Sequence, residues 1–299
     1  MDRFASMEAF VRAADLGSFA AAAEALDLSA PMIGKHVRFL EERLGVRLLN
    51  RTTRRQSLTD FGRAYYDRCR TILAETVAAE ALASEHLGEP SGRLRVTMPA
   101  HFGRRCVAPV LLNLAQQYPR LELELSFSDP IADLVQQGYD LAIRTGTLED
   151  RAGIVARRIA RQPMVLCAAP SYLERHSMPT GLDDLGRHQA ILYGRSGWAR
   201  PWQFPQAGLP PLQIVPTGRL RFDDLDAMAD AAAAGLGLAW LPVWLIRDRI
   251  GSGEVVIVLP DQPRFLYDGY ALWPQSPLLP LKVRVAIDEL AKALPPLMS

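Results

Sequence analysis

The chain has 299 residues, of which 49% are hydrophobic and 22% are charged, and its formal net charge is +1. This length leaves room for two or three compact units with a sizeable core. The composition is ordinary for a soluble protein, and a net charge so close to zero argues at first against a nucleic-acid partner.

The sequence shows neither a secretory signal nor a membrane-spanning segment. The first ten residues, MDRFASMEAF, lack a basic segment followed by an apolar run, so they do not form a secretory signal. The most apolar later segment, 225–246, is interrupted by Asp226, Asp230, two glycines and Pro242. That segment is too broken for a membrane span. We expect a cytoplasmic protein with no membrane partner.

Cysteine and histidine residues follow no catalytic or metal-binding spacing. The three cysteines are odd in number and far apart, and the five histidines are scattered. The residues are Cys69, Cys106, Cys167, His36, His86, His101, His176 and His188. We therefore expect a reduced protein that is not an enzyme and needs no cofactor or metal. Buried packing is the simpler role for Cys106 and Cys167, and a redox switch is the alternative.

The overall charge is close to zero, but a basic block lies near the N-terminus. Residues 28–70 contain ten lysines and arginines against four acids, a local charge of +6. The following residues, 71–90, contain four glutamates and no basic residue. A basic block on a neutral protein suits contact between one part of the chain and a polyanion.

The chain opens with three predicted helices. The spacing of the first apolar residues predicts a helix that ends at Gly17, and Ser18 can cap an alanine-rich second helix. The apolar residues of the first helix are Phe4, Met7, Phe10, Val11 and Ala14. Ser29 can cap a third helix, with Pro31 in its first turn, and Gly45 closes it.

The third helix has two faces. Ile33, Val37, Leu40 and Leu44 form one core-facing stripe, and His36 flanks it. The outward positions are Met32, Lys35, Arg38 and Phe39. A short helix followed by a helix with an exposed basic face describes a helix-turn-helix.

The segment after it, VRLLNRTTRRQSLTD (46–60), is extended and contains turn residues, and so it predicts a wing. Its arginines can make bidentate contacts with phosphates, and its threonines can donate through their hydroxyl groups. Solvated surface is the alternative for arginines in a loop. The adjacent basic helix favours contact with DNA.

This N-terminal sequence resembles the DNA-binding domain of LysR-type transcriptional regulators. The family pattern of helix, Gly-Ser-Phe, helix, Ser-x-Pro and LE..LG..L..R..R...LT..G is matched by residues 10–62. Two positions depart from the family: Gly34 replaces the usual Ser or Thr, and Leu49 replaces a common Phe. Gly34 costs about 1 kcal/mol of helix propensity relative to Ala and removes a hydroxyl beside the DNA-facing positions.

The resemblance implies double-stranded DNA as partner and selects the candidate contacts. They are Ser29, Pro31, Met32, Lys35, His36, Arg38, Arg51, Thr52, Thr53, Arg54 and Arg55. For Lys35 and His36 the alternative is a solvated helix face. Met32 either meets a thymine methyl group or packs within the domain.

A long helix is predicted from Thr59, its N-cap, through residue 88. The apolar stripe of this helix comprises Phe61, Tyr65, Cys69, Ile72, Leu73 and Val77. A second copy of the chain is the natural cover for such a stripe, and the rest of the same chain is the alternative. The family resemblance implies a homodimer or homotetramer that binds an interrupted inverted repeat. It also implies RNA polymerase as a partner.

Beyond the Gly/Pro hinge at 89–92, strands and helices alternate, which predicts a mostly parallel, covered sheet. This part resembles the family's effector-binding region, which has the fold of type 2 periplasmic solute-binding proteins. We therefore expect an α/β chain overall. Its predicted units are a winged helix-turn-helix (1–58), a linker helix (59–88) and a two-lobed effector domain (93–299), with lobe I at about 93–162 and 268–299 and lobe II at about 163–267.

Ligands of such folds bind at strand C-termini between the lobes. A small-molecule effector, of anionic character, is expected there. The candidate contacts are Ala100, His101, Phe102, Gly103, Asp129, Arg144, Tyr193, Arg195, Asp223 and Asp224. The backbone donors of 101–103 could hold a carboxylate at a helix start. Asp223 is alternatively an N-cap, and Arg144 is alternatively part of an interlobe ion pair.

Two other classes of protein fit less well. A transport-type solute-binding protein would fit the second half of the chain, but it needs an export signal and leaves the winged helix unused. An enzyme would need a nucleophile with a base, or a metal cluster, and no spacing supplies either. The sequence thus predicts a transcriptional regulator whose lobes respond to a small molecule.

Overall fold

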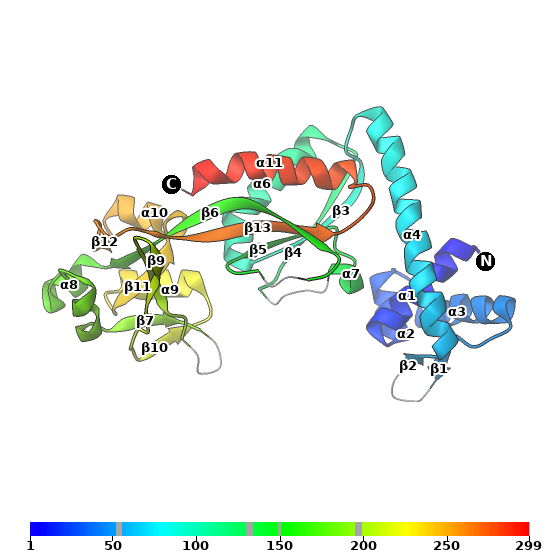
Figure 1. The fold of residues 1–299 in the computed structure, drawn as a ribbon, viewed down its shortest axis with the longest axis horizontal. Helices are drawn as coiled ribbons and strands as arrows, with labels where there is room; N and C mark the ends of the chain where they lie inside the picture. The colour runs from blue at the N-terminus through cyan, green and yellow to red at the C-terminus, as the bar shows by residue number, and fades with distance from the viewer. Residues whose placement is uncertain (52–55, 130–133, 149–150, 195–198, 299) are drawn as a thin grey trace.

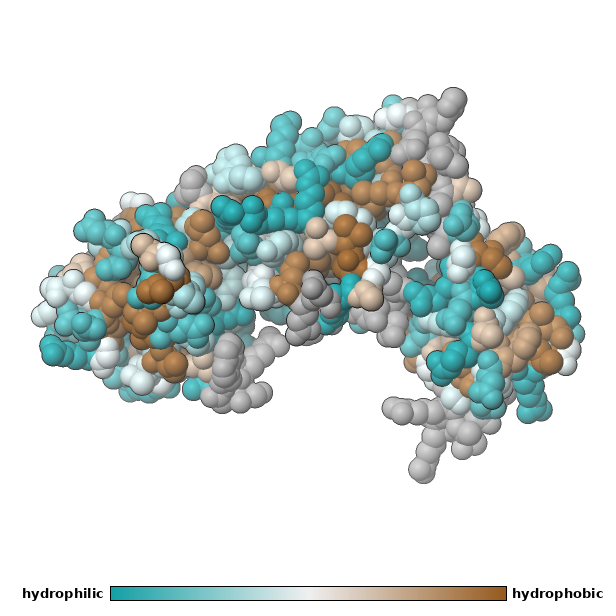
Figure 2. Space-filling view, in the orientation of Figure 1, coloured by the Kyte–Doolittle hydropathy of each residue, from teal (hydrophilic) through white to brown (hydrophobic). Residues whose placement is uncertain are grey.

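The computed structural model describes residues 1–51, 56–129, 134–148, 151–194 and 199–298. A small helical domain at the N-terminus stands beside an elongated α/β domain, and the long helix α4 rises from the first toward the second (Figure 1). On the side away from α11 a hollow separates the two bodies (Figure 2), and α1 of the small domain lies against α7 of the large one.

The N-terminal domain is the predicted winged helix-turn-helix. Its elements are α1 (Arg3–Leu16), α2 (Phe19–Ala25), α3 (Ala30–Leu44) and the antiparallel strands β1 (Leu49–Arg51) and β2 (Gln56–Leu58). Ser18 caps α2 by accepting from the amides of Ala20 and Ala21, as predicted. Phe4 differs from the prediction, because it is half exposed while Met7 and Phe10 fill the core.

Helix α4 (Asp60–Leu87) begins where predicted, and the hydroxyl oxygen of Thr59 accepts the Gly62 amide at 2.8 Å. Its own domain covers part of the apolar stripe: Tyr65, Cys69 and Leu73 pack in the cluster that includes Phe10 of α1. For these residues the alternative, packing against the rest of the same chain, is therefore the one that the structure shows. Phe61 and Ile72 are 48% and 39% exposed, and the side chain of Val77 lies outside the described residues.

The α/β domain is built on one nine-stranded sheet in the described residues. Strands β4, β3 and β5 run parallel at one end, and β10, β7 and β11 run parallel at the other. The strand bounds are β3 (Gly92–Met98), β4 (Leu121–Phe127), β5 (Leu141–Thr145), β6 (Ile154–Ala168), β7 (Ala190–Tyr193), β10 (Leu220–Phe222), β11 (Leu238–Pro242), β12 (Val256–Val258) and β13 (Phe265–Pro274).

The two ends of the sheet are joined by the long antiparallel pair β6 and β13. Strand β6 also pairs antiparallel with β11 and β12, and β13 with β5. The sheet is therefore mixed, and the prediction of a mostly parallel sheet is wrong at its centre. Strands that cross between two lobes run in opposite directions because the chain passes to the far lobe and later returns. We call the β3–β5 end the first lobe and the β7–β11 end the second lobe.

Helices cover both lobes. The first lobe carries α5 (Ala100–Phe102), a π-helical turn at Gly103–Val107, α6 (Ala108–Gln117), α7 (Leu134–Gln137) and α11 (Leu281–Leu297). The second carries α8 (Pro170–His176), a 3-10 turn at Leu182–Arg187, α9 (Leu225–Ala233) and α10 (Val243–Ser252). The hairpin β8 (Trp202–Gln206) and β9 (Leu209–Ile214), α8, α10 and the 3-10 turn were absent from the predicted elements.

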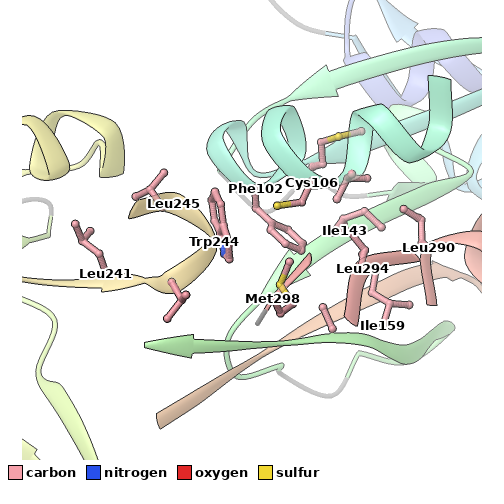
Figure 3. Close-up of a cluster of buried hydrophobic side chains, with 14 of the residues drawn as sticks. Phe102, Cys106, Ile143, Ile159, Leu241, Trp244, Leu245, Leu290, Leu294 and Met298 are labelled. Atoms are coloured by element: carbon pink, nitrogen blue, oxygen red, sulfur yellow. The ribbon is translucent and has the colours of Figure 1, made fainter. Parts of the chain in front are cut away.

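The main core joins the lobes. In the first lobe, Leu290 and Leu294 of α11 pack with Ile143 of β5 and Ile159 of β6. Trp244 of α10 reaches this cluster from the second lobe, and its ring centroid lies 5.7 Å from that of Phe102 (Figure 3). One apolar cluster thus crosses the boundary between the lobes.

All three cysteines are buried free thiols. Burial raises the pKa of Cys69 to about 11 and the pKa values of Cys106 and Cys167 to about 12. These thiols are therefore protonated at neutral pH, where a thiolate would be needed for reactivity. The packing role predicted for Cys106 and Cys167 agrees with their place in the core.

None of the helices in the described part of the chain combines the length and apolar character that crossing a bilayer requires. Within the same residues, no three His, Cys, Asp or Glu side chains are grouped so that they could hold a metal ion.

His188 should make the second lobe sensitive to acid. Burial lowers the pKa of His188 below the ordinary 6.5, and its Nδ1 lies 3.3 Å from the hydroxyl of Tyr172. The unfolded chain therefore binds the proton more readily than the folded one, so stability is complete above pH 6.5 and falls as the pH drops below it. Denaturant unfolding between pH 8 and 5 should show this loss. His188→Phe should flatten the curve, and an unchanged slope in that variant would contradict the assignment.

Candidate DNA-binding surface and effector pocket

The predicted DNA-facing residues of α3 share one exposed surface. Pro31, Met32, Lys35 and Arg38 are exposed, while Ile33, Val37 and Leu40 are buried on the opposite face. The residue before the helix, Ser29, occupies the N-cap position, but its side chain makes no capping hydrogen bond. Its exposed hydroxyl group is therefore available to an outside acceptor or donor.

His36 is placed differently from this group. Its side chain is 8% exposed, and its Nδ1 lies 2.9 Å from the hydroxyl oxygen of Ser6 in α1. The ring thus joins α3 to α1 inside the domain and does not stand on the exposed face with Lys35. This differs from the expected DNA contact, because position 36 lies on the edge of the buried stripe.

The wing is tied to the end of α3. The carboxylate of Glu41 accepts hydrogen bonds from the amides of Leu48 and Leu49, at 2.9 and 3.3 Å. Arg51 ends β1 opposite Gln56 of β2. The predicted contacts Thr52, Thr53, Arg54 and Arg55 lie outside the described residues, between β1 and β2 in the sequence.

Gly34 faces inward, toward α2. A Cβ atom at this position would lie 3.5 Å from the ring of Phe19, which is an ordinary packing distance. A hydroxyl-bearing side chain at position 34 would therefore point toward Phe19. The sequence suggested that Gly34 removes a hydroxyl group from the DNA-facing surface. The structure differs, because a side chain at position 34 would face Phe19 instead.

A cavity of about 100 Å³ lies between the two lobes. Residues from both lobes form its wall, and many of them are aromatic. The lining residues are Pro99, His101, Phe102, Asp129, Thr145, Gln162, Met164, Tyr193, Arg200, Trp202, Leu225, Met228, Trp240, Pro242, Trp244 and Tyr267. Four predicted contacts are in this wall: His101, Phe102, Asp129 and Tyr193.

The backbone donors at the start of α5 are partly occupied. The amide of Ala100 donates to the carboxylate of Asp129 at 3.2 Å, and the amide of Gly103 donates to the carbonyl of Pro99 at 2.7 Å. These two N–H groups are therefore not free for a ligand carboxylate, contrary to the prediction for Gly103. Gly103 itself is needed for space, since a Cβ atom there would overlap the side chain of Met98.

Arg144 lies outside the cavity wall. Its side chain is 7% exposed and donates to the carbonyl of Ile143 at 2.7 Å and to the hydroxyl of Thr97 at 3.3 Å. Burial lowers the pKa of its guanidinium, and the nearby Asp129 acts in the opposite direction. The structure thus places Arg144 inside the first lobe, outside the wall of this cavity, which differs from the position expected from the sequence.

A polar clasp joins the lobes beside the cavity. His101 of the first lobe lies 2.8 Å from the carboxylate of Asp226 through Nδ1 and 3.2 Å from that of Asp224 through Nε2. Arg105 donates to the other oxygen of Asp226 at 2.8 Å. The hydrogen bond from the Ala227 amide, and secondarily His101, hold the pKa of Asp224 below its usual value.

The clasp changes the interpretation of the predicted aspartates. Asp224 caps α9 and also faces His101, whereas Asp223 is exposed and is not in the cavity wall. The predicted contact Arg195 lies outside the described residues.

Several lining residues were missed in the sequence, above all Gln162, Arg200, Trp240, Trp244 and Tyr267. They come from segments as far apart as Gln162 and Tyr267. Two elements that carry them, the first part of β6 and helix α10, were not predicted from the sequence. The density of tryptophan between 198 and 244 was the available signal. Trp202 is buried and packs in the second-lobe core, and it also lines the cavity.

The fold and the two sites define a class of protein, in which a winged helix-turn-helix domain is joined by one helix to a two-lobed domain with a cavity between the lobes. Two family descriptions match the chain: "Bacterial regulatory helix-turn-helix protein, lysR family" over residues 4–63, and "LysR substrate binding domain" over residues 87–295. The chain therefore belongs to the LysR family of transcriptional regulators, with a helix-turn-helix and an effector-binding domain.

Individual relatives agree with this assignment along the whole chain. The transcriptional activator AaeR of Escherichia coli K12 is 33% identical, covering 97% of this chain and 93% of that protein. The transcriptional regulator PtxR of Pseudomonas aeruginosa is 36% identical, covering 96% and 91%. Among solved structures, the Vibrio cholerae virulence activator AphB is 28% identical, with a TM-score of 0.61 and coverage of 98% and 100%.

Proposed function

We propose that this LysR-type regulator binds double-stranded DNA as a dimer or tetramer at an interrupted inverted repeat, and that a small molecule in the cavity between its lobes modulates this binding. The observation that carries the first part is the exposed surface of α3, where Lys35 and Arg38 stand opposite a fully buried stripe. Such a helix can enter the major groove with its cations toward the phosphates.

The proposed subunit interface is on α4. Phe61 and Ile72 remain exposed after α1 has covered Tyr65, Cys69 and Leu73. A second α4 would remove these apolar side chains from water, and a two-fold arrangement of the pair would present two copies of α3 to two half-sites. The proposed units remain 1–58 for DNA binding, 59–88 for pairing and 93–299 for the effector.

The proposed regulation depends on the relative position of the lobes. The clasp of His101 and Arg105 with Asp224 and Asp226 holds the lobes together at the cavity. A ligand that contacts both walls favours one lobe arrangement over another by its difference in affinity for the two. By linkage, the same difference changes how the paired winged helices span their half-sites.

The DNA-binding surface can be tested without knowledge of the operator. In the double variant Lys35→Ala/Arg38→Ala, the dependence of log K on log salt for a random-sequence duplex should become shallower by about two counterions. Fluorescence anisotropy of a labelled duplex across a salt series measures this slope. Affinity should fall at every salt concentration below the point where binding is lost.

A matched control is Arg187→Ala, which removes an exposed arginine from the second lobe, far along the chain from α3. This variant should keep the slope of the parent protein. If the α3 double variant also keeps that slope, the helix does not face DNA and the proposed surface is wrong.

A further inference from the structure

We propose that Arg12 of the winged helix and Gly138 of the first lobe form a docking contact that sets which spacing between two half-sites the regulator accepts. The contact lies within one chain, between helix α1 and the turn that follows α7. This inference rests on the proposed function in one respect, namely that paired winged helices bind an inverted repeat.

The two domains are joined by a segment that permits rotation. Helix α4 ends at Leu87, and strand β3 begins at Gly92. Gly88 and Gly92 have φ angles of 67° and 80°, and a Cβ atom at either position would meet nothing within 4 Å. Unhindered glycines leave the backbone free to turn. The orientation of the winged helix therefore depends on contacts made elsewhere.

The contact of α1 with α7 lies far from this hinge, whereas α11 touches α4 close to it (Figure 1). Helix α4 holds α1 through Tyr66, whose hydroxyl donates to the carboxylate of Asp15. At 1.5 Å per residue, the part of α4 from Tyr66 to Leu87 is about 30 Å long. A hinge rotation of roughly 10° would therefore move α1 by about 5 Å, enough to separate it from α7.

Arg12 occupies the space beside Gly138 that a side chain would fill. Its guanidinium lies so close to the glycine that a Cβ atom there would overlap the Nη1 and Nη2 atoms. Both residues are half-buried, and Gly138 has a φ angle of 67°. Glycine thus serves two purposes here, the left-handed turn and the close approach of α1 to the backbone.

The turn that Arg12 contacts is fixed to the sheet of the first lobe. Arg95 of β3 donates through Nη1 to the carbonyls of Gln137 and Gly138, each at 3.0 Å. The same guanidinium pairs with Glu124 of β4 at 2.7 Å and lies 5.3 Å from the ring centroid of Tyr139. The position of Gly138 therefore follows the position of the first lobe.

On the other side of the contact, α1 is fixed to α3. Phe10 and Val11, next to Arg12 in the sequence, are buried in the core of the winged helix. Ser6 of α1 and His36 of α3 are joined by a hydrogen bond of 2.9 Å. The DNA-facing surface of α3 therefore keeps a constant position relative to Arg12.

Docking leaves this surface accessible, since Lys35 and Arg38 are exposed, but it fixes the direction in which the surface points. In a two-fold dimer, two docked domains hold two copies of α3 at one separation and one angle. Each added base pair moves a half-site by about 3.4 Å and turns it by roughly 35°. A docked dimer therefore matches one spacing, whereas an undocked dimer can follow several through its hinges.

The test begins with DNA that the full-length protein selects from a random pool of duplexes. The spacing between the two half-sites of an enriched duplex is then changed by one, two or three base pairs in either direction. Fluorescence anisotropy gives a dissociation constant for each spacing. For the parent protein, a change of two base pairs should weaken binding about twentyfold or more.

Two substitutions remove the contact from opposite sides. Arg12→Ala removes the guanidinium. Gly138→Asn keeps the left-handed backbone, which asparagine adopts more readily than most residues, and places a side chain where Arg12 lies. Each variant should reduce the discrimination between spacings at least about fivefold. The double variant should reduce it no further, because both changes break the same contact.

Gly153→Asn is the matched control. Gly153, just before β6, also has a left-handed φ angle, 78°, but nothing lies within 4 Å of its Cβ position. This variant should discriminate between spacings as the parent protein does. A folding defect lowers the apparent affinity by the same factor at every spacing, so it does not imitate a change in discrimination.

The docking contact is refuted if the parent protein binds all spacings equally, or if Arg12→Ala and Gly138→Asn discriminate as the parent does. It is also refuted if Gly153→Asn loses as much discrimination as Gly138→Asn. A protein that enriches no duplex at all would count against the proposed DNA-binding function, and the inference would fall with it. Enriched duplexes with unchanged discrimination in the variants would count against the docking contact alone.

Discussion

Replacement of Gly62 by alanine is expected to lower the unfolding free energy of the DNA-binding domain by about 1–3 kcal/mol. The added methyl group has no room, because the backbone of α4 at position 62 lies directly against the backbone of Leu48. A Cβ atom at position 62 would overlap the carbonyl oxygen of Leu48, which also accepts the amide of Thr59 at 3.0 Å. A carbonyl that is already bonded cannot move aside as a flexible side chain can. The first turn of α4 must then separate from the start of the wing.

Gly34→Ala is the matched control, since this glycine also lies in a helix of the same domain. Its Cβ atom would meet Phe19 at an ordinary 3.5 Å. The substitution should therefore stabilise the domain, by up to about 1 kcal/mol of helix propensity. If both variants change the unfolding free energy in the same direction, the contact with Leu48 is not the reason why position 62 needs a glycine.

The two domains can be monitored separately in this experiment. All five tryptophans (Trp198, Trp202, Trp240, Trp244 and Trp273) lie in the effector domain, so their fluorescence reports its unfolding. Far-ultraviolet circular dichroism reports the helices of both domains. Gly62→Ala should move the circular dichroism transition to lower denaturant and leave the fluorescence transition in place.

The second large effect is expected at Trp244. Trp244→Ala should lower the unfolding free energy of the effector domain by roughly 3–5 kcal/mol, since it empties a buried site where α10 meets the first lobe. The ring packs on Phe102 (Figure 3). Its N–H donates to the Oε1 of Gln162 at 2.8 Å. Denaturant unfolding followed by the four remaining tryptophans measures the change.

Trp244→Phe separates packing from hydrogen bonding. Phenylalanine keeps a ring in the core but leaves the Oε1 of Gln162 without a donor, which costs about 1–3 kcal/mol. The loss should therefore be smaller than in the alanine variant. Equal losses would mean that the ring contributes little and that the joint between the lobes lies elsewhere.

The elements that the sequence predicted well are those defined by local pattern. The stripe of Ile33, Val37 and Leu40 on α3 is buried as its period requires. Strand β4, Leu121–Phe127, has the sequence LELELSF, in which apolar residues alternate with glutamate over most of the length, as is typical of a strand. In both cases neighbours in the sequence are also neighbours in the structure, so periodicity is enough.

The site was harder to predict because its residues meet only through long-range pairing. Gln162 and Tyr267 are brought together by the register of β6 and β13, and Arg200 joins them from the second lobe. Arg144 and His36 were predicted to contact a ligand or DNA, but both side chains are buried. Arg144 hydrogen-bonds Thr97, and His36 hydrogen-bonds Ser6, so each side chain points into its own domain. No local pattern in the sequence reports such contacts.

The place of α11 in the chain has a consequence for biosynthesis. The first lobe takes β3, β4 and β5 from residues 92–145, but Leu290 and Met298, which pack in its core, come from the end of the chain. A ribosome delivers the winged helix and the whole second lobe before these residues, and domains fold as units as they emerge. The first lobe must therefore wait for the last segment, with its apolar residues uncovered. A chain that stops before α11 should aggregate and be degraded rather than persist as a shortened regulator.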